Sequence, residues 1–231
     1  MHLLILGSRG EVDHSAPYHS RHSGLLIDST LLIDLGEEEF LEHNPEAVLL
    51  THLHPDHAYF VRDSKIKQEC PFGLPVYAPE GNGNIKILHK AKTIAGYTVN
   101  PILTHHSLKV ESQAYRIDSD SKRILYTGDM IWIDKKYHHL LEGLDLVITE
   151  GSYMRKGGLV RKDKKAGKIY GHTGIPDLVS LFKDHCAHIV LVHFGSWFYD
   201  SAVQARRKIK DLAKKNGITI TAGYDNMSLT I

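Results

Sequence analysis

The chain has 231 residues, of which 42% are hydrophobic and 24% are charged, and its net charge is +1. This composition is ordinary for a globular protein, and no apolar run approaches the roughly 20 residues of a membrane span. The two cysteines, Cys70 and Cys186, are too few for a disulfide framework. We therefore expect one domain over residues 1–231, cytoplasmic, with free thiols and no membrane contact.

Strands predominate in the predicted secondary structure. Apolar or alternating runs predict them at Leu3–Leu6, Gly24–Ile27, Thr30–Asp34, Val48–Thr51, Val76–Tyr77, Tyr97–Leu103, Gln113–Ile117, Arg123–Thr127, Leu146–Thr149, Ile189–His193, Ile218–Thr221 and Ser228–Ile231. Helices are predicted at Pro79–Lys90, Pro176–His185 and Ser201–Lys215. Because strands open the chain and then alternate with helices, we expect an α/β domain of sheets with covering helices.

A basic segment interrupts this pattern at Arg155–Lys168. Seven lysines and arginines lie between Tyr153 and His172, against the single acid Asp163, and several glycines accompany them. The glycines predict a loop. Such a loop is either a solvated surface segment or a flap that attracts anions. In the second interpretation, candidate substrate-binding residues are Arg155, Lys156 and Arg161.

The most informative motif is the hexapeptide from His52 to His57, which reads His-Leu-His-Pro-Asp-His and follows the apolar run Ala47–Thr51. Three histidines and an aspartate at the end of a buried strand are costly to desolvate without a partner. Imidazole and carboxylate are the usual non-thiolate ligands of zinc. Ligands this dense can hold two metal ions, which activate water, so the motif indicates hydrolysis.

Other ligand-type residues also follow predicted strands. His105 and His106 come after Ile102-Leu103-Thr104, Asp129 after a strand that ends at Thr127, and His193 ends the run that begins at Ile189. Each residue alone is more often structural. Together with the hexapeptide, they predict one metal site at the ends of several strands.

These motifs resemble the metallo-β-lactamase fold superfamily. The hexapeptide matches the HxHxDH motif of that family, Thr127-Gly128-Asp129 matches its later Gly-Asp segment, and the segment from Val192 to Ser196 resembles its final histidine motif. The resemblance spans most of the chain in the correct order. It implies a four-layer αββα sandwich with the site at one edge of two facing sheets.

Within the superfamily, the chain is similar to the branch of ribonuclease Z and PhnP-type phosphodiesterases. Gly7-Ser8-Arg9-Gly10 follows the first strand, and His172 lies 21 residues before His193, where that branch places an extra catalytic histidine. The resemblance divides seven ligands between two metal positions: His52, His54 and His106 at the first, Asp56, His57 and His193 at the second, and Asp129 bridging both.

The resemblance also implies catalytic roles. His172 would protonate the leaving group or stabilise charge at the phosphate, and Asp56 would also orient the attacking water. Glu150, at the end of a predicted strand, would hydrogen-bond a ligand or the catalytic histidine. His106 is preferred to His105 because Ser107 follows it, and adjacent side chains in a strand point to opposite faces.

The sequence departs from the pattern of this branch in two places, and these departures narrow the functions that the resemblance implies. Only 22 residues separate His106 from Asp129, too few for the long tRNA-binding arm of ribonuclease Z. The acidic residue that the family places near the bridging aspartate is replaced here by Tyr126. The sequence therefore does not support a role in tRNA 3′ processing.

The expected function is that of a dinuclear metal-dependent phosphodiesterase, in which a metal-bound hydroxide attacks a nucleotide, a cyclic phosphate or a short nucleic acid. Two divalent ions are expected, Zn²⁺ first, with Mn²⁺ or Fe²⁺ as alternatives, and a homodimer is left open. Two other functions stay open on the same fold: a lactone or thioester hydrolase, and a mononuclear iron oxidoreductase of the sulfur dioxygenase type.

Overall fold

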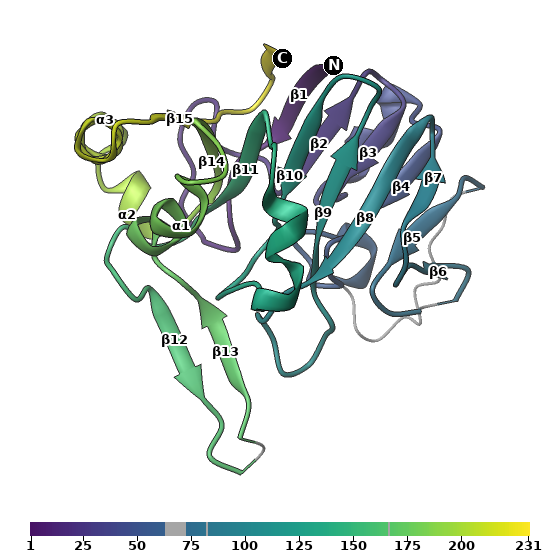
Figure 1. The fold of residues 1–231 in the computed structure, drawn as a ribbon, viewed down its shortest axis with the longest axis horizontal. Coiled ribbons are helices and arrows are strands. Elements are labelled where there is room, and N and C mark those ends of the chain that lie inside the picture. Colours follow the sequence, from purple (N-terminus) through teal and green to yellow (C-terminus); the bar gives the residue numbers. More distant parts are fainter. Residues whose placement is uncertain (63–72, 82, 166) are drawn as a thin grey trace.

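Two seven-stranded sheets lie face to face in the computed structural model, which describes residues 1–62, 73–81, 83–165 and 167–231 (Figure 1). The first sheet has the order β16-β1-β2-β3-β4-β5-β6, with strands β1 (His2–Gly7), β2 (Gly24–Ile27), β3 (Leu31–Ile33), β4 (Ala47–Leu49), β5 (Val76–Ala78), β6 (Lys86–Ile87) and β16 (Met227–Thr230). Its strands are antiparallel from β16 to β3 and parallel from β3 to β6.

The second sheet has the order β15-β14-β11-β10-β9-β8-β7. Its strands are β7 (Lys92–Ile94), β8 (Tyr97–Leu103), β9 (Gln113–Asp118), β10 (Arg123–Tyr126), β11 (Leu146–Gly151), β14 (His188–Phe194) and β15 (Thr219–Ala222). It repeats the layout of the first sheet, antiparallel from β7 to β10 and parallel from β10 to β15. The carboxyl ends of the parallel strands therefore meet at one edge of the double sheet.

The main core fills the space between the two sheets, where Leu3, Ile27, Leu49, Tyr115 and Ile148 are fully or almost fully buried. A second core lies under α1 (Ile175–Phe182), α2 (Ser196–Tyr199), α3 (Ala202–Asn216) and the 3-10 helix η3 (Lys135–Leu141). Because β11 is covered on both faces, all six of its residues are buried, and it begins with three consecutive apolar residues, Leu146–Ile148, rather than an alternating pattern.

A third core lies on the outer face of the first sheet, around Leu26, Leu32 and Val48. In the described part of the chain, this face is covered by the 3-10 helices η1 (Glu38–His43) and η2 (Tyr59–Val61). The four-layer arrangement expected from the resemblance is confirmed, with short 3-10 helices in this outer layer. Among the described residues, no helix combines the length and apolar character of a membrane span.

A two-stranded hairpin, β12 (Leu159–Lys162) and β13 (Ile169–His172), projects from the body of the molecule (Figure 1). Within the basic segment Arg155–Lys168, Leu159–Lys162 form β12, so the prediction of a loop is wrong for those residues. The glycines mark the ends of the hairpin instead: Gly157 and Gly158 precede β12, and Gly167 precedes β13, all with positive φ. Backbone pairing from Leu159 with His172 to Lys162 with Ile169 closes the hairpin.

The helix predicted at Pro79–Lys90 is also wrong. The described part of this segment holds β6 between turns, and Gly83 there adopts a φ of 60°. Glycine favours such left-handed backbone and disfavours a helix interior. The predicted hairpin at Asp28-Ser29 is confirmed, with φ of 45° and 61°, and α1 and α3 lie where helices were predicted. Cys186 is buried, and Cys70 lies outside the described residues.

Candidate metal centre

The structure brings the seven predicted ligands together at the edge where the parallel strands end. The hexapeptide follows β4, His106 follows β8, Asp129 follows β10, and His193 lies near the end of β14. Parallel register sets this convergence, because Tyr126 of β10 pairs with Ile148 of β11, and Glu150 of β11 pairs with Val192 of β14. The seven side chains are called the metal cluster below.

The first half of the metal cluster consists of three histidines. His54 Nδ1 lies 3.0 Å from His52 Nε2 and 3.2 Å from His106 Nε2. Burial lowers the pKa of His52 well below its usual value and lowers the pKa of His54 to about 4, with neighbouring histidines adding to the effect. The rings are therefore neutral at pH 7 and offer converging lone pairs, as metal ligands do.

The second half combines the carboxylate of Asp56 with two histidines, His57 and His193. Asp56 Oδ2 lies 2.8 Å from His193 Nε2 and 3.7 Å from His57 Nε2. Burial alone would lower the pKa of His57, but the charges of Asp34, Asp129 and Asp56 outweigh it and raise that pKa. This half is thus a dense, buried arrangement of opposite charges.

Asp129 lies between the two halves. Its Oδ2 faces the first half, 3.8 Å from His52 Nε2 and 3.6 Å from His106 Nε2, while its Oδ1 faces the second, 3.4 Å from His57 Nε2 and 3.3 Å from His193 Nδ1. Burial would favour the neutral acid, but His193, His57 and His172 hold the pKa of Asp129 well below its usual value. The carboxylate therefore stays ionised.

The donor set fits metal ions. Asp129 Oδ1 is buried and accepts no hydrogen bond from any described residue. An ionised oxygen left without a donor in a buried site is costly, unless a cation supplies the missing interaction. The two groups His52–His54–His106 and Asp56–His57–Asp129–His193 each keep their ligand atoms within 4.8 Å of one another.

Two glycines allow this close packing. A Cβ on Gly128, whose φ is 56°, would lie 2.6 Å from the side chain of Thr51. A Cβ on Gly10 would lie 3.0 Å from the ring of His193. Gly10 and Gly128 thus let the backbone come closer to the metal cluster than a residue with a side chain could. They belong to the Gly7-Ser8-Arg9-Gly10 and Thr127-Gly128-Asp129 motifs.

His193 has an unusual backbone, with a φ of 52° that non-glycine residues rarely adopt. The following residue is fixed on both sides: Phe194 N donates to Ser8 O at 2.8 Å, and Gly10 N donates to Phe194 O at 3.1 Å. Ser8 is fixed in turn, because its Oγ donates to Asp225 Oδ1 at 2.7 Å. A strained backbone conformation that several hydrogen bonds hold in place is typical of functional sites.

The structure separates the two histidines of the third motif. His106 Nδ1 donates to Gly171 O at 3.0 Å, which leaves Nε2 free to face the metal cluster. His105 turns away, packs against Trp132 with the two rings tilted by 32°, and places its Nε2 3.0 Å from Asp134 Oδ1. The preference for His106 therefore agrees with the geometry.

His172 lies at the mouth of the metal cluster, at the end of β13. Its Nδ1 contacts Glu150 Oε2 at 2.8 Å, and the other oxygen of Glu150 accepts from Met130 N at 2.7 Å. Burial alone would lower the pKa of His172, but Glu150 and Asp129 raise it to about 9. Glu150 thus orients a histidine that carries a proton at pH 7.

Sequence reasoning missed two positioning residues. Asp34 is fully buried, and its Oδ2 lies 2.7 Å from His57 Nδ1 while its Oδ1 accepts from Thr51 N at 2.7 Å. Ser152 Oγ lies 3.0 Å from His193 Nδ1. Both follow apolar strands at the same edge of the sheets, which is the signal that revealed the ligands.

The three candidate substrate-binding residues lie around the hairpin. Arg155 precedes β12, and its Nε donates to Gly158 O at 2.8 Å. Lys156 and Arg161 are exposed. The hairpin is tied to the metal cluster, because Gly171 N donates to His106 O at 2.7 Å. The structure therefore places these cations on the hairpin or just before it, and not among the ligands of the metal cluster.

Comparisons with known proteins agree with this architecture. A family model described as "Beta-lactamase superfamily domain" matches residues 38–194, more than half of the chain. A search of curated proteins gave no match. The fold is similar to that of the metallo-β-lactamase fold protein YhfI from Bacillus subtilis, with a TM-score of 0.67 and 19% identity over 99% of this chain and 98% of that one.

Two further solved structures are similar over almost the whole of both chains. A diphosphatase from the PhnP family has a TM-score of 0.68 and 18% identity, covering 99% of this chain and 96% of that one. The short form of human tRNase Z has a TM-score of 0.63 and 16% identity, covering 100% and 99%. The chain therefore belongs to the β-lactamase superfamily and has the metallo-β-lactamase fold.

Proposed function

We propose that this protein is a dinuclear metal-dependent hydrolase that cleaves phosphodiesters. The observation that carries the dinuclear part is the two-sided contact of Asp129, whose oxygens face separate groups of ligand atoms. In this proposal, His52, His54 and His106 hold one ion, Asp56, His57 and His193 hold the other, and Asp129 bridges them. Nitrogen and oxygen ligands favour zinc, with manganese or iron as alternatives.

Bound divalent ions would activate water and stabilise negative charge on the substrate. The chain supplies the proton. Because Glu150 occupies Nδ1 of His172, the proton on Nε2 would be the one available to a substrate bound at the metal cluster. His172 would hand this proton to the leaving oxygen as the phosphorus–oxygen bond breaks, and Glu150 would stabilise its charged form before transfer.

The charge around the site supports a phosphate substrate. The hairpin and its base carry seven lysines and arginines against Asp163. No described acidic side chain forms an ion pair with Arg155, Lys156 or Arg161. Lysine and arginine without acidic partners are suited to phosphate oxygens. Two structures of similar fold are named as a diphosphatase and a tRNase Z, which supports the same class of substrate.

A substrate panel on the metal-loaded protein tests the proposal. We expect bis(p-nitrophenyl) phosphate to be hydrolysed with Zn²⁺ or Mn²⁺, and faster than p-nitrophenyl acetate or a simple lactone. Turnover of the lactone without any phosphodiester cleavage would favour the carboxyl-ester alternative. One iron per chain, with no zinc or manganese, would favour the oxidoreductase alternative.

A further inference from the structure

His172, the proposed proton donor, lies in a segment that backbone hydrogen bonds hold on both sides. Before it, Gly171 N donates to His106 O at 2.7 Å. After it, Thr173 N donates to Met130 O at 3.1 Å. His106 belongs to the first half of the metal cluster, and Met130 directly follows the carboxylate that lies between the two halves. The backbone of the proton donor is therefore joined to the backbone that carries the ligands.

Gly171 bonds to His106 through both of its backbone groups. Besides the bond from its N–H, its carbonyl oxygen accepts from His106 Nδ1 at 3.0 Å. A neutral histidine that donates through Nδ1 presents a lone pair on Nε2, and this Nε2 lies 3.2 Å from His54 Nδ1 within the metal cluster. Metal-binding histidines are commonly oriented in this way, by a carbonyl oxygen that accepts from the second ring nitrogen. Gly171 thus fixes both the tautomer of His106 and the backbone next to His172.

Only glycine fits at position 171. Its φ of 118° is one that residues with a side chain rarely adopt, and a Cβ there would lie 2.0 Å from Leu159 O in β12. Gly158, at the base of the same hairpin, is confined in the same way, because its Cβ would lie 2.3 Å from His172 O. In both places the obstructing atom belongs to the backbone, which cannot rotate away as a side chain can. A displacement of Gly171 would therefore also move its neighbours His106 and His172.

The side chains of His106 and His172 contact each other as well. Their ring centroids lie 4.7 Å apart, with the two planes inclined by 63°. Glu150 Oε2, 2.8 Å from His172 Nδ1, fixes the imidazole ring of His172 but not its backbone. The position of His172 thus depends on two residues, on Glu150 through the ring and on Gly171 through the chain.

We infer that Gly171 is a positioning residue that couples the proposed metal ligand His106 to the proton donor His172. The inference rests on the proposed function and adds a residue outside the set of ligands. Coupling between two sites is reciprocal. Metal binding at His106 should therefore stabilise the base of the hairpin, and a change at Gly171 should weaken metal binding as well as misplace the proton donor.

Metal affinity is the first test, with two matched glycine variants of the hairpin. Gly171→Ala introduces the backbone clash, whereas Gly167→Ala, also at a positive φ (67°), places its Cβ with no described atom within 4 Å. Competition with a chromogenic chelator for Zn²⁺ should show a 10–100-fold loss of affinity at the weakened position in Gly171→Ala, the usual effect of removing a group that orients a ligand. Gly167→Ala should bind as the wild type does. Equal affinities in all three proteins would overturn the inference.

Turnover at saturating metal separates a misplaced proton donor from a lost metal ion. A displacement of about 1 Å can slow a reaction about 10²-fold. We expect a loss in kcat of this size in Gly171→Ala for the dinucleotide TpT, whose leaving group is an alkoxide. The loss should be smaller for bis(p-nitrophenyl) phosphate, because p-nitrophenolate leaves without a proton. An equal loss in kcat for both substrates would contradict a role of Gly171 in placing His172.

Hydrogen exchange of the wild type tests the coupling without any substitution or substrate, and it decides the question if Gly171→Ala does not fold. Adding Zn²⁺ to the metal-free protein should slow exchange of the Gly171 amide about 5–150-fold, the range of typical coupling between sites. The reference is the amide of Asp163, which donates to Lys168 O at 2.8 Å at the far end of the hairpin and should change less. No slowing at Gly171, or equal slowing at both amides, would contradict the coupling.

Failure of the proposed function would give a different result. If the wild type cleaves neither phosphodiester, but Gly171→Ala weakens metal binding and Zn²⁺ protects the Gly171 amide, the proposed function is wrong and the link between His106 and Gly171 stands. If both phosphodiesters are cleaved and Gly171→Ala matches Gly167→Ala in affinity and turnover, only the coupling is wrong.

Discussion

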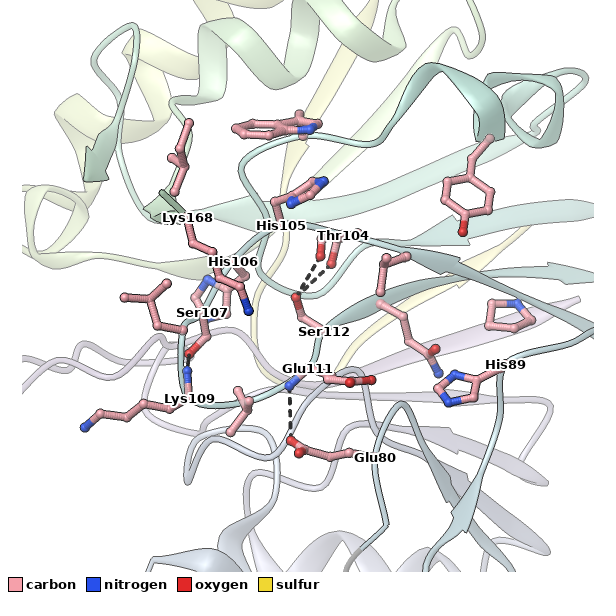
Figure 2. A pocket seen from close by; sticks show the side chains of 18 of the residues that line it. Glu80, His89, Thr104, His105, His106, Ser107, Lys109, Glu111, Ser112 and Lys168 are labelled. Carbon is pink, nitrogen blue, oxygen red and sulfur yellow. Dashed lines mark hydrogen bonds between the residues drawn. The ribbon is translucent and has the colours of Figure 1, made fainter. Parts of the chain in front are cut away.

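A cavity of about 980 Å³, the flanking cavity, adjoins the metal cluster at Ser107, and the two are built in opposite ways (Figure 2). The metal cluster is almost entirely buried, and rigid strand ends position its ligands, with each supporting residue itself hydrogen-bonded. The flanking cavity is open, and loops and the hairpin supply most of its lining. If the proposed function holds, the sheets would fix the residues that carry out the reaction, and the loops and the hairpin would influence which substrate binds.

The largest loss of activity should follow from replacing Asp129, the proposed bridging carboxylate. Asp129→Asn keeps the shape of the side chain but removes the charge that faces both halves of the metal cluster. We expect phosphodiester turnover to fall by at least about 10³-fold, since a metal ion contributes several kcal/mol to transition-state stabilisation. Asp145→Asn, at a surface ion pair with Lys122, is the matched control and should retain activity. Comparable activity in both variants would show that Asp129 is not part of the active site.

Removing the proton donor should leave the metals in place. His172→Ala is expected to slow turnover by about 10²–10⁴-fold, the usual contribution of a general acid. The loss should be larger for an alkyl leaving group than for p-nitrophenolate, which needs no proton. His139→Ala, at an exposed histidine, serves as control. An equal loss for both leaving groups would contradict the role of His172 as acid.

Replacing a residue that orients a ligand should have a smaller effect than replacing the ligand or the proton donor. Asp34→Asn weakens the contact that orients His57. Residues in this position typically contribute 10–100-fold to metal affinity, so we expect a loss of about that size. A competition titration with a chromogenic chelator would measure it. An unchanged affinity would mean that Thr51, which also contacts Asp34, is its only relevant partner.

The cations of the hairpin should contribute more to the binding of long substrates than to that of short ones. Replacing Arg155, Lys156 and Arg161 by alanine removes three exposed or partly exposed cations beside the site. For a single-stranded oligonucleotide, the slope of log KM against log salt should decrease by about 0.7 for each phosphate that the variant no longer neutralises. A slope equal to that of the wild type would assign these cations to the solvated surface.

The smallest expected effect is on thermal stability. It concerns the hydrogen bonds that hold Ser8, whose backbone in turn holds the residue after His193. Arg206 Nη2 donates to His19 Nε2 at 2.8 Å, and His19 Nδ1 lies 2.9 Å from Ser8 Oγ. Burial and the charge of Arg206 lower the pKa of His19 to about 4, against the smaller opposing effect of Asp225. Below its unfolded pKa of about 6.5, only the unfolded chain takes up the proton, so stability falls as the pH decreases toward 4.

His19→Gln should remove this dependence. Between pH 7 and pH 4.5, we expect the Tm of the wild type to fall about 2–4 °C further than that of the variant, the shift that about 1 kcal/mol produces in a chain of this size. His43→Gln, at an exposed histidine, should follow the wild type. A parallel decline in all three proteins would place the acid sensitivity elsewhere.

The sequence indicates a metal site because ligand-type residues are dense in the hexapeptide and follow apolar strands elsewhere, and the structure brings these side chains close together. His52 to His57 needed no knowledge of tertiary contacts. Asp34 was missed because a lone aspartate after a strand is indistinguishable from turn chemistry until His57 lies beside it. The family and the fold were predicted correctly from these motifs.

The rest of the fold was harder to predict for physical reasons. The strand β12 was mistaken for a loop because the glycines on either side of it outweighed its short, charged sequence. β6 has only two residues, too few for any periodicity, so its segment was taken for a helix. The flanking cavity combines Glu80, Trp132 and Lys168 from separate segments, and only tertiary structure brings them together.

The central claim is that the metal cluster holds two ions, one on each side of Asp129. Metal analysis of the purified, reconstituted protein by mass spectrometry tests it most directly. We expect two divalent ions per chain in the wild type and a clear loss in Asp129→Ala. A single ion per chain that Asp129→Ala leaves in place would contradict it.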